Sequence, residues 1–276
     1  MSGEVAKKSE TAQGMGPGLD LRRFTPARVS LEQAGAAVST REHLNFQLDH
    51  AMARDAVHAR MNVVAMMQSL RARGRACIAL RSAASPPGQS DRSVYLRRPD
   101  LGRKLDPRSV EALREGFMKT ARGLEVAVVI ADGLSALAVD RHALALLDAV
   151  DAEGLDTWAE APVCIVSNGR VAVGDEVGLA LRAELAVMLI GERPGLSSPD
   201  SLGIYLTWEP RPGRTDAERN CISNIRAEGL GYRDAARRLV YYIREARRLR
   251  TTGVVLKERS SEERAKLGGR ASDADD

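Results

Sequence analysis

The chain has 276 residues, of which 44% are hydrophobic and 28% are charged, with a net charge of +4 and a pI of about 9.1. These values are ordinary for a globular protein of one or two domains with a real core. The mildly basic charge permits a nucleic-acid or phosphate-rich partner but does not require one. No apolar run approaches the ~20 residues of a membrane span, and no repeat with a period of about 20–50 residues indicates a solenoid or propeller.

Residues 1–18 are polar and lack the apolar region of a secretory signal, so we expect a disordered leader. The three cysteines (Cys77, Cys164 and Cys221) match neither a disulfide framework nor a metal site. An odd number of cysteines and the lack of an export signal predict a reducing, cytoplasmic location.

Residues 19–110 predict a small N-terminal helical domain. A helix is expected over 41–60, capped by a side-chain oxygen at residue 39 or 40, and a second helix over 62–73. The residues that recur at helical spacing in the first of these helices are Leu44, Leu48, Ala51 and Asp55. Turn signals rich in proline and glycine follow.

A domain boundary is predicted near residue 110, within a helix over 107–121. Beyond it, apolar segments predict strands over 124–131, 162–166, 185–190 and 202–208. Helices expected over 135–150 and 175–183 separate the first three, and this alternation is typical of a parallel sheet. We therefore predict an α/β domain over 111–258, with a Rossmann-like, mostly parallel sheet flanked by helices, and a disordered tail over 259–276.

Small and polar residues follow each predicted strand, and the carboxyl ends of parallel strands share one edge of a sheet. The four ends are Asp132-Gly133, Ser167-Asn168-Gly169, Gly191-Glu192-Arg193 and Glu209-Pro210. Such an edge is where open α/β sheets bind ligands, and glycine lets a ligand approach the backbone. The alternative is that these are ordinary turns between strands and helices.

Catalytic and phosphate-binding motifs are missing from the chain. No phosphate loop, dinucleotide-binding glycine pattern, nucleophile elbow or zinc-protease motif is found. The four histidines (43, 50, 58 and 142) fall within predicted helices, so we assign no catalytic residue and no metal ligand to this chain.

Polar residues are dense between Thr207 and Arg226. Thr215 followed by Glu218 resembles a helix start with a capping carboxylate. We expect a short helix that carries Cys221 and Asn224 on related faces, beside a loop that forms a ligand wall.

Several of these segments together resemble the small subunit of ethanolamine ammonia-lyase. The most similar run is GERPGLSSPDSLGIYLTWEPRPGRTDAERNCISNIRAEGL, residues 191–230. Further matches are VIADGLSA (129–136), SNGRVAVGDEVG (167–178), LRRFTPARVSLEQAG (21–35) and LNFQLDHAMARDAVH (44–58). The resemblance thus extends from about Leu21 to Lys257.

The resemblance implies a subunit of a carbon–nitrogen lyase that converts ethanolamine to acetaldehyde and ammonia with adenosylcobalamin. A separate large subunit would hold the substrate, while this chain would contact the corrin and form a hetero-oligomer with that subunit. By this resemblance Val171, Glu192 and Cys221 are cofactor contacts, with Arg170 as a further candidate. The resemblance also implies a bacterial microcompartment as a possible location, because some members of the family are packaged in one.

Some cobalamin proteins supply a histidine to cobalt through the motif D-x-H-x-x-G. Asp140-Arg141-His142 begins in this way, but Ala145 stands where the glycine is needed. We therefore predict that His142 does not ligate cobalt and that the cofactor's own base stays on the metal.

Three other interpretations fit the sequence. The chain could be a stand-alone Rossmann-type protein that binds a small molecule or nucleotide, or a paralogue that keeps the fold without activity. It could also be a basic protein that binds nucleic acid through an arginine-bearing helix over 232–250. The apolar stripe of that helix must pack on something, and acidic residues are interleaved nearby, so we do not expect nucleic acid as a partner. The short apolar runs predict no membrane partner.

Overall fold

The computed structural model describes residues 37–85, 92–117 and 123–257, with isolated positions before residue 37. The expected disordered leader (1–18) and tail (259–276) lie outside the described residues. The described chain forms two compact units, which divide after Leu48. The first unit contains the antiparallel pair β1 (Gln33–Ala34) and β2 (Ala37–Val38) and the start of α1 (Thr40–His58).

The second unit is built on a six-stranded sheet with the order β3-β5-β4-β6-β7-β8. Its strands are β3 (Cys77–Arg81), β4 (Val126–Ala131), β5 (Val163–Ser167), β6 (Leu185–Gly191), β7 (Leu202–Trp208) and β8 (Arg219–Ile225). All residues of β4 and β6 are buried, because helices cover both faces of these central strands. The four strands predicted from apolar runs are therefore confirmed.

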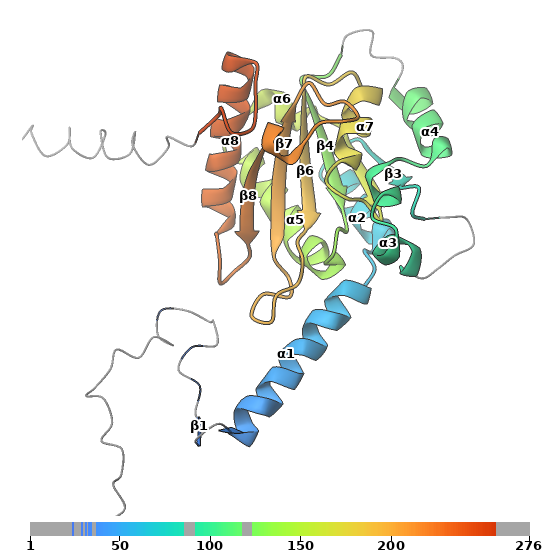
Figure 1. The fold of residues 1–276 in the computed structure, drawn as a ribbon. Helices are drawn as coiled ribbons and strands as arrows, with labels where there is room; N and C mark the ends of the chain where they lie inside the picture. The colour runs from blue at the N-terminus through green and yellow to red at the C-terminus, as the bar shows by residue number, and fades with distance from the viewer. Residues whose placement is uncertain are drawn as a thin grey trace, which may run out of the picture. The chain divides into compact units, whose positions relative to one another are not determined.

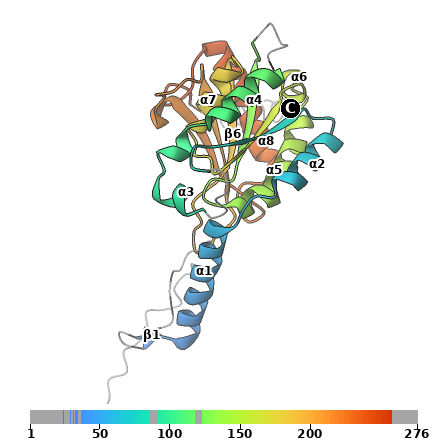
Figure 2. The same ribbon diagram turned by 90° about the vertical axis from the view of Figure 1, so that its right-hand side faces the viewer.

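Helices lie on both faces of this sheet, as the two views of the ribbon show (Figures 1 and 2). One face packs against α2 (Val63–Ala72), α5 (Ala136–Asp151) and α8 (Tyr232–Leu249). The other face packs against α4 (Pro107–Phe117) and α7 (Val173–Ala180). The short helices are α3 (Ser93–Arg97) and α6 (Asp156–Ala159). None of the described helices is both long and apolar enough to cross a membrane.

The sheet is mixed, which corrects the expectation of a mostly parallel, Rossmann-like sheet. β3, β5, β4 and β6 are parallel to one another, but β7 is antiparallel to β6 and to β8. Loop 192–201 is too short for the crossover that a parallel neighbour requires. The end of β7 at Glu209 and Pro210 consequently lies at the opposite edge from the ends of β4, β5 and β6, not on the same rim as expected.

The N-terminal helical domain expected over 19–110 is not confirmed in its details. α1 and α2 are helical as predicted, and Ser39 Oγ accepts the Glu42 backbone N–H at 3.3 Å, as expected for a cap. However, β3 belongs to the main sheet, where it pairs in parallel with β5. The boundary near residue 110 stays a prediction.

The segment after Thr215 is a strand and not the expected helix. The predicted capping pair is present, because Glu218 Oε2 accepts the Thr215 backbone N–H at 2.7 Å. It starts only the single 3-10 turn Asp216–Glu218, after which the chain enters β8. Pairing with β7 satisfies the backbone of β8 and buries Arg219, and this tertiary contact overrides the local helix signal.

Candidate functional site

The candidate site lies at the edge of the sheet where the chain reverses direction around β4. From β4 the chain passes through α5 to β5 on one side and then through α7 to β6 on the other side. A crevice therefore opens between the carboxyl ends of β4 and β6, the usual ligand site of such sheets. Beside the crevice the ends of β4 and β6 contact each other directly, because a Cβ on Gly133 would lie 2.1 Å from the Gly191 carbonyl oxygen and only glycine fits there.

Three of the four candidate residues line one pocket of about 390 Å³ in this crevice. Arg170 and Val171 come from the loop between β5 and α7, and Glu192 comes directly after β6. Tyr205 on β7 lines the same pocket. The fourth candidate, Cys221, is opposite Tyr205 in the pairing of β7 with β8. The fold thus gathers the four candidates around Tyr205.

Glu192 is held in place by the strands beside it. Its carboxylate accepts hydrogen bonds from the Ser201 hydroxyl and, at 3.2 Å, from the Asn224 backbone N–H. Gly203 leaves room for this side chain, since a Cβ there would lie 2.9 Å from Glu192 Oε1. The half-buried carboxylate is therefore oriented at the pocket wall while it keeps acceptor capacity for a ligand.

Cys221 and Tyr205 are directly opposite each other in the pairing of β7 with β8. Desolvation raises the pKa of the Cys221 thiol, and the nearby Glu192 carboxylate acts in the same direction, against the opposing hydrogen bond from Tyr205. Desolvation also raises the pKa of Tyr205. Both groups are therefore protonated at neutral pH, which suits Cys221 to a contact role and not to nucleophilic attack.

One face of β7 and β8 is open beside this pocket. α8 packs on the opposite face of the two strands, whereas α7 packs on β4 and β6. Cys221 is exposed and Tyr205 half-buried. Figure 1 shows no helix of the described chain in front of β7 and β8. We call the surface formed by Tyr205 and Cys221, bordered by Val171 and Glu192, the open face.

Cationic and aromatic groups also contribute to the pocket wall. The guanidinium groups of Arg170 and Arg92 lie 4.3 Å and 4.8 Å from the centroid of the buried Tyr95 ring, and Tyr95 and Arg170 line the pocket. Arg92 also donates to the Gly133 carbonyl and so ties these groups to the end of β4. Arg170 Nε is buried without a hydrogen-bond partner.

Sequence reasoning did not single out Tyr95, Arg92 or Tyr205. Tyr95 and Arg92 lie in a stretch of turn signals that carries no recognisable pattern. Tyr205 could have been found, because it alternates with Ile204 and Leu206, which are buried against the α8 side of the sheet.

His142 lies within α5, and both its ring nitrogens have partners in the chain. Nδ1 is 2.8 Å from the Tyr232 hydroxyl, and Nε2 is 3.4 Å from Asp200 Oδ2. The other three histidines lie on α1. Among the described residues, no group of three or more His, Cys, Asp or Glu side chains could hold a metal ion.

Comparison with known proteins gives one consistent family. The model of the ethanolamine ammonia-lyase light chain matches residues 17–257. The ethanolamine ammonia-lyase small subunit of Pseudomonas aeruginosa (strain LESB58) is 53% identical over 248 residues, which cover 90% of this chain and 89% of that protein. The small subunit of Azotobacter vinelandii is 53% identical over 260 residues (93% of each chain), and that of Xanthomonas campestris pv. campestris (strain B100) is 54% identical over 239 residues (86% of each).

Proposed function

The chain belongs to the ethanolamine ammonia-lyase light-chain family, and from this premise we propose that it is the small subunit of an adenosylcobalamin-dependent ethanolamine ammonia-lyase. The enzyme would convert ethanolamine to acetaldehyde and ammonia, and a large subunit would hold the substrate. When bound, adenosylcobalamin supplies the radical chemistry through homolysis of its cobalt–carbon bond. This chain contributes binding and orientation of the corrin and no catalytic residue of its own.

The observation that carries the proposal is the convergence of the four candidate residues. Arg170, Val171, Glu192 and Cys221 come from three separate segments, yet they border one crevice and the open face next to it. A corrin is a wide, flat ring with an apolar plane and a fringe of amides. An exposed sheet face bordered by an apolar side chain and a hydrogen-bond acceptor suits both features.

Each residue has a role that follows from its surroundings. Val171 offers apolar contact to the ring edge, and the oriented Glu192 carboxylate accepts hydrogen bonds from amide groups. The protonated Cys221 thiol gives van der Waals contact on the open face. Arg170, whose Nε has no partner in the chain, donates to a polar group of the cofactor. A ring held there would also exclude water from its covered side.

We further propose that the enzyme acts in the cytoplasm, with a bacterial microcompartment as the alternative. The described cysteines are all free thiols, which agrees with a reducing environment. The proposal for His142 is unchanged: it does not ligate cobalt, because both its ring nitrogens are occupied within the chain.

The test is co-expression with a candidate large subunit, followed by two measurements on the complex. Adenosylcobalamin should support aldehyde release from ethanolamine, and it should slow alkylation of Cys221 relative to the cofactor-free complex. Glu192→Ala should weaken cofactor binding about tenfold, the effect of losing hydrogen bonds to a charged group.

Glu184→Ala is the matched control, because Glu184 is an exposed glutamate just before the start of β6, at the opposite edge of the sheet. Equal cofactor affinity in the wild type and in Glu192→Ala would remove Glu192 from the site. Ligand binding by the chain alone, with no effect of a large subunit, would instead favour a stand-alone small-molecule binder.

A further inference from the structure

A second cavity, of about 640 Å³, adjoins the site and shares Arg170 and Val171 with the first pocket. Three parts of the chain line it: residues 99–104, residues 170–176 in the loop before α7 and its first turn, and residues 212–219 in the loop before β8 and at its start. The two cavities therefore meet at the loop that precedes α7.

The second cavity is basic. The cationic side chains that line it are Arg103, Lys104, Arg170, Arg214 and Arg219. The acidic ones are Asp175, Glu176 and Asp216. Asp175 is paired with Arg219, and Glu176 Oε2 accepts the Leu105 backbone N–H at 2.6 Å. Because five cationic side chains line the cavity against three carboxylates, its lining carries a net positive charge.

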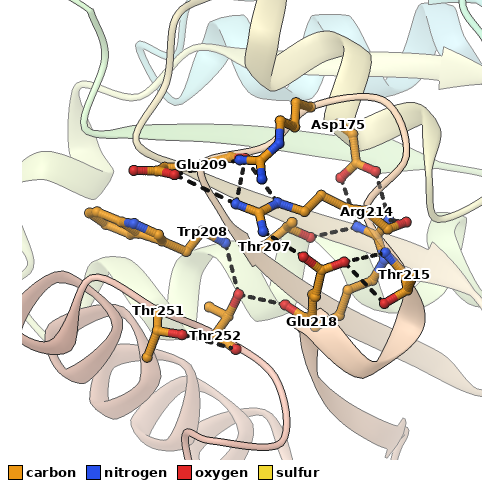
Figure 3. Close-up of polar contacts among 11 residues, drawn as sticks. Asp175, Thr207, Trp208, Glu209, Arg214, Thr215, Glu218, Thr251 and Thr252 are labelled. Atoms are coloured by element: carbon orange, nitrogen blue, oxygen red, sulfur yellow. Dashed lines mark hydrogen bonds and ion pairs between the residues drawn. The ribbon is translucent and has the colours of Figure 1, made fainter.

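Part of the wall is a rigid polar network, shown in Figure 3. Arg214 lies between Glu209 and Glu218, with Nη1 at 2.5 Å from Glu218 Oε1 and Nη2 at 3.2 Å from the Glu209 carbonyl oxygen. Glu218 in turn accepts the Thr215 backbone N–H. Arg214 and Arg219 thus stabilise the loop and are not free for a ligand.

The remaining cations have no such partner. Arg103, Lys104 and Arg170 form no ion pair with any residue in the described part of the chain. Arg170 contacts the Tyr95 ring, and its Nε is buried without a hydrogen bond. Arg103 and Lys104 are exposed at the mouth of the cavity. Three cations without an ion-pair partner around one cavity are suited to a phosphate ester, which guanidinium and ammonium groups bind with charge-assisted hydrogen bonds.

We propose that this cavity binds the phosphodiester of the nucleotide tail of the corrinoid. The inference rests on the proposed function, because cobalamin carries its phosphodiester on a side chain that leaves the rim of the corrin. With the ring on the open face, that tail can enter the cavity past Arg170. Arg103 and Lys104 then neutralise the phosphate, while Arg170 contacts both the ring side and the tail side.

The test measures the affinity of the two-subunit complex for three corrinoids: adenosylcobalamin, adenosylcobinamide, which lacks phosphate, ribose and base, and adenosylcobinamide phosphate. Arg103→Ala combined with Lys104→Ala should raise the Kd of the two phosphate-bearing ligands about tenfold or more. The same variant should change the Kd of adenosylcobinamide less than about twofold. Inorganic phosphate should compete with adenosylcobalamin but not with adenosylcobinamide.

The matched control combines Arg97→Ala with Arg108→Ala, which removes the same charge from exposed positions that do not line the cavity. It should leave all three affinities unchanged. Equal effects of Arg103→Ala/Lys104→Ala on all three corrinoids, or none on any, would overturn the inference. Phosphate binding without competition against adenosylcobalamin would overturn it too and indicate a separate anion site. A wild-type complex that binds no corrinoid refutes the proposed function itself.

Discussion

The ion pair between Asp175 and Arg219 is buried, so the fold should be sensitive to the loss of either partner. Each side chain is only 2% exposed. The Arg219 guanidinium donates to the two Asp175 carboxylate oxygens at 2.7 Å and 2.6 Å, to Thr207 Oγ1 at 2.6 Å and to the Arg214 carbonyl at 3.0 Å. Burial by itself would lower the pKa of Arg219, but Asp175 raises it, so the arginine stays charged in the protein interior.

Asp175→Ala leaves that cation buried without its main counter-charge. Breaking one half of a buried pair costs about 3–5 kcal/mol. Asp216 lies 3.6 Å from Arg219 Nε but is 94% exposed, so water screens most of its compensation. We therefore expect a loss of about 3 kcal/mol, which is about 1 M in the urea midpoint for an unfolding slope near 3 kcal/mol/M.

Urea unfolding of the purified chain, followed by circular dichroism, measures this loss. A second variant, Asp175→Leu with Arg219→Met, removes both charges and should be more stable than Asp175→Ala, although Thr207 and the Arg214 carbonyl lose a partner. A loss below about 1 kcal/mol for Asp175→Ala, or a double variant less stable than the single one, would refute the reasoning.

Three further predictions follow from individual contacts. The Thr215 backbone N–H and the Arg214 side chain lower the pKa of Glu218 to about 2. The stabilisation that the Glu218 carboxylate provides should therefore be complete above its unfolded pKa of about 4.3 and disappear as the pH falls towards 2. Unfolding of Glu218→Gln and of the wild type across this pH range measures the effect. Cys221, whose thiol pKa is raised, should react with iodoacetamide more slowly than free cysteine at pH 7.5, and its reaction should become faster as the pH rises. Cys164 is buried and has a pKa raised to about 12, so it should stay unmodified until the chain unfolds. Mass spectrometry of the alkylated chain measures both reactions. Ser135→Ala should cost about 1–2 kcal/mol in urea unfolding, because Ser135 Oγ caps α5 by accepting the Ala138 N–H at 3.2 Å.

For each of these three predictions, one experimental outcome would contradict the reasoning. A stability difference between Glu218→Gln and wild type that is the same at pH 7 and pH 2.5 contradicts the capping role of the carboxylate. Faster alkylation of Cys221 than of free cysteine at pH 7.5 contradicts a raised thiol pKa. A Ser135→Ala variant as stable as the wild type means that water replaces the cap.

The amino-acid sequence by itself determined the family, the central strands and the candidate residues. β4, β5 and β6 were predictable because a strand buried on both faces must be apolar throughout, which is a local signal. The resemblance of residues 167–178 and 191–230 to the family implied Val171, Glu192 and Cys221 as candidates, because a long run of similar residues carries more information than any short motif.

Only the tertiary structure decided how these parts meet. The capping pair at Thr215 and Glu218 is the same whether a helix or a strand follows, and the pairing of β8 with β7 selects the strand. The antiparallel direction of β7 depends on the length of the loop before it, and it moves Glu209 to the opposite edge of the sheet. The open face and the basic cavity join residues distant in sequence, so their chemistry is set by strand order, which no local pattern encodes.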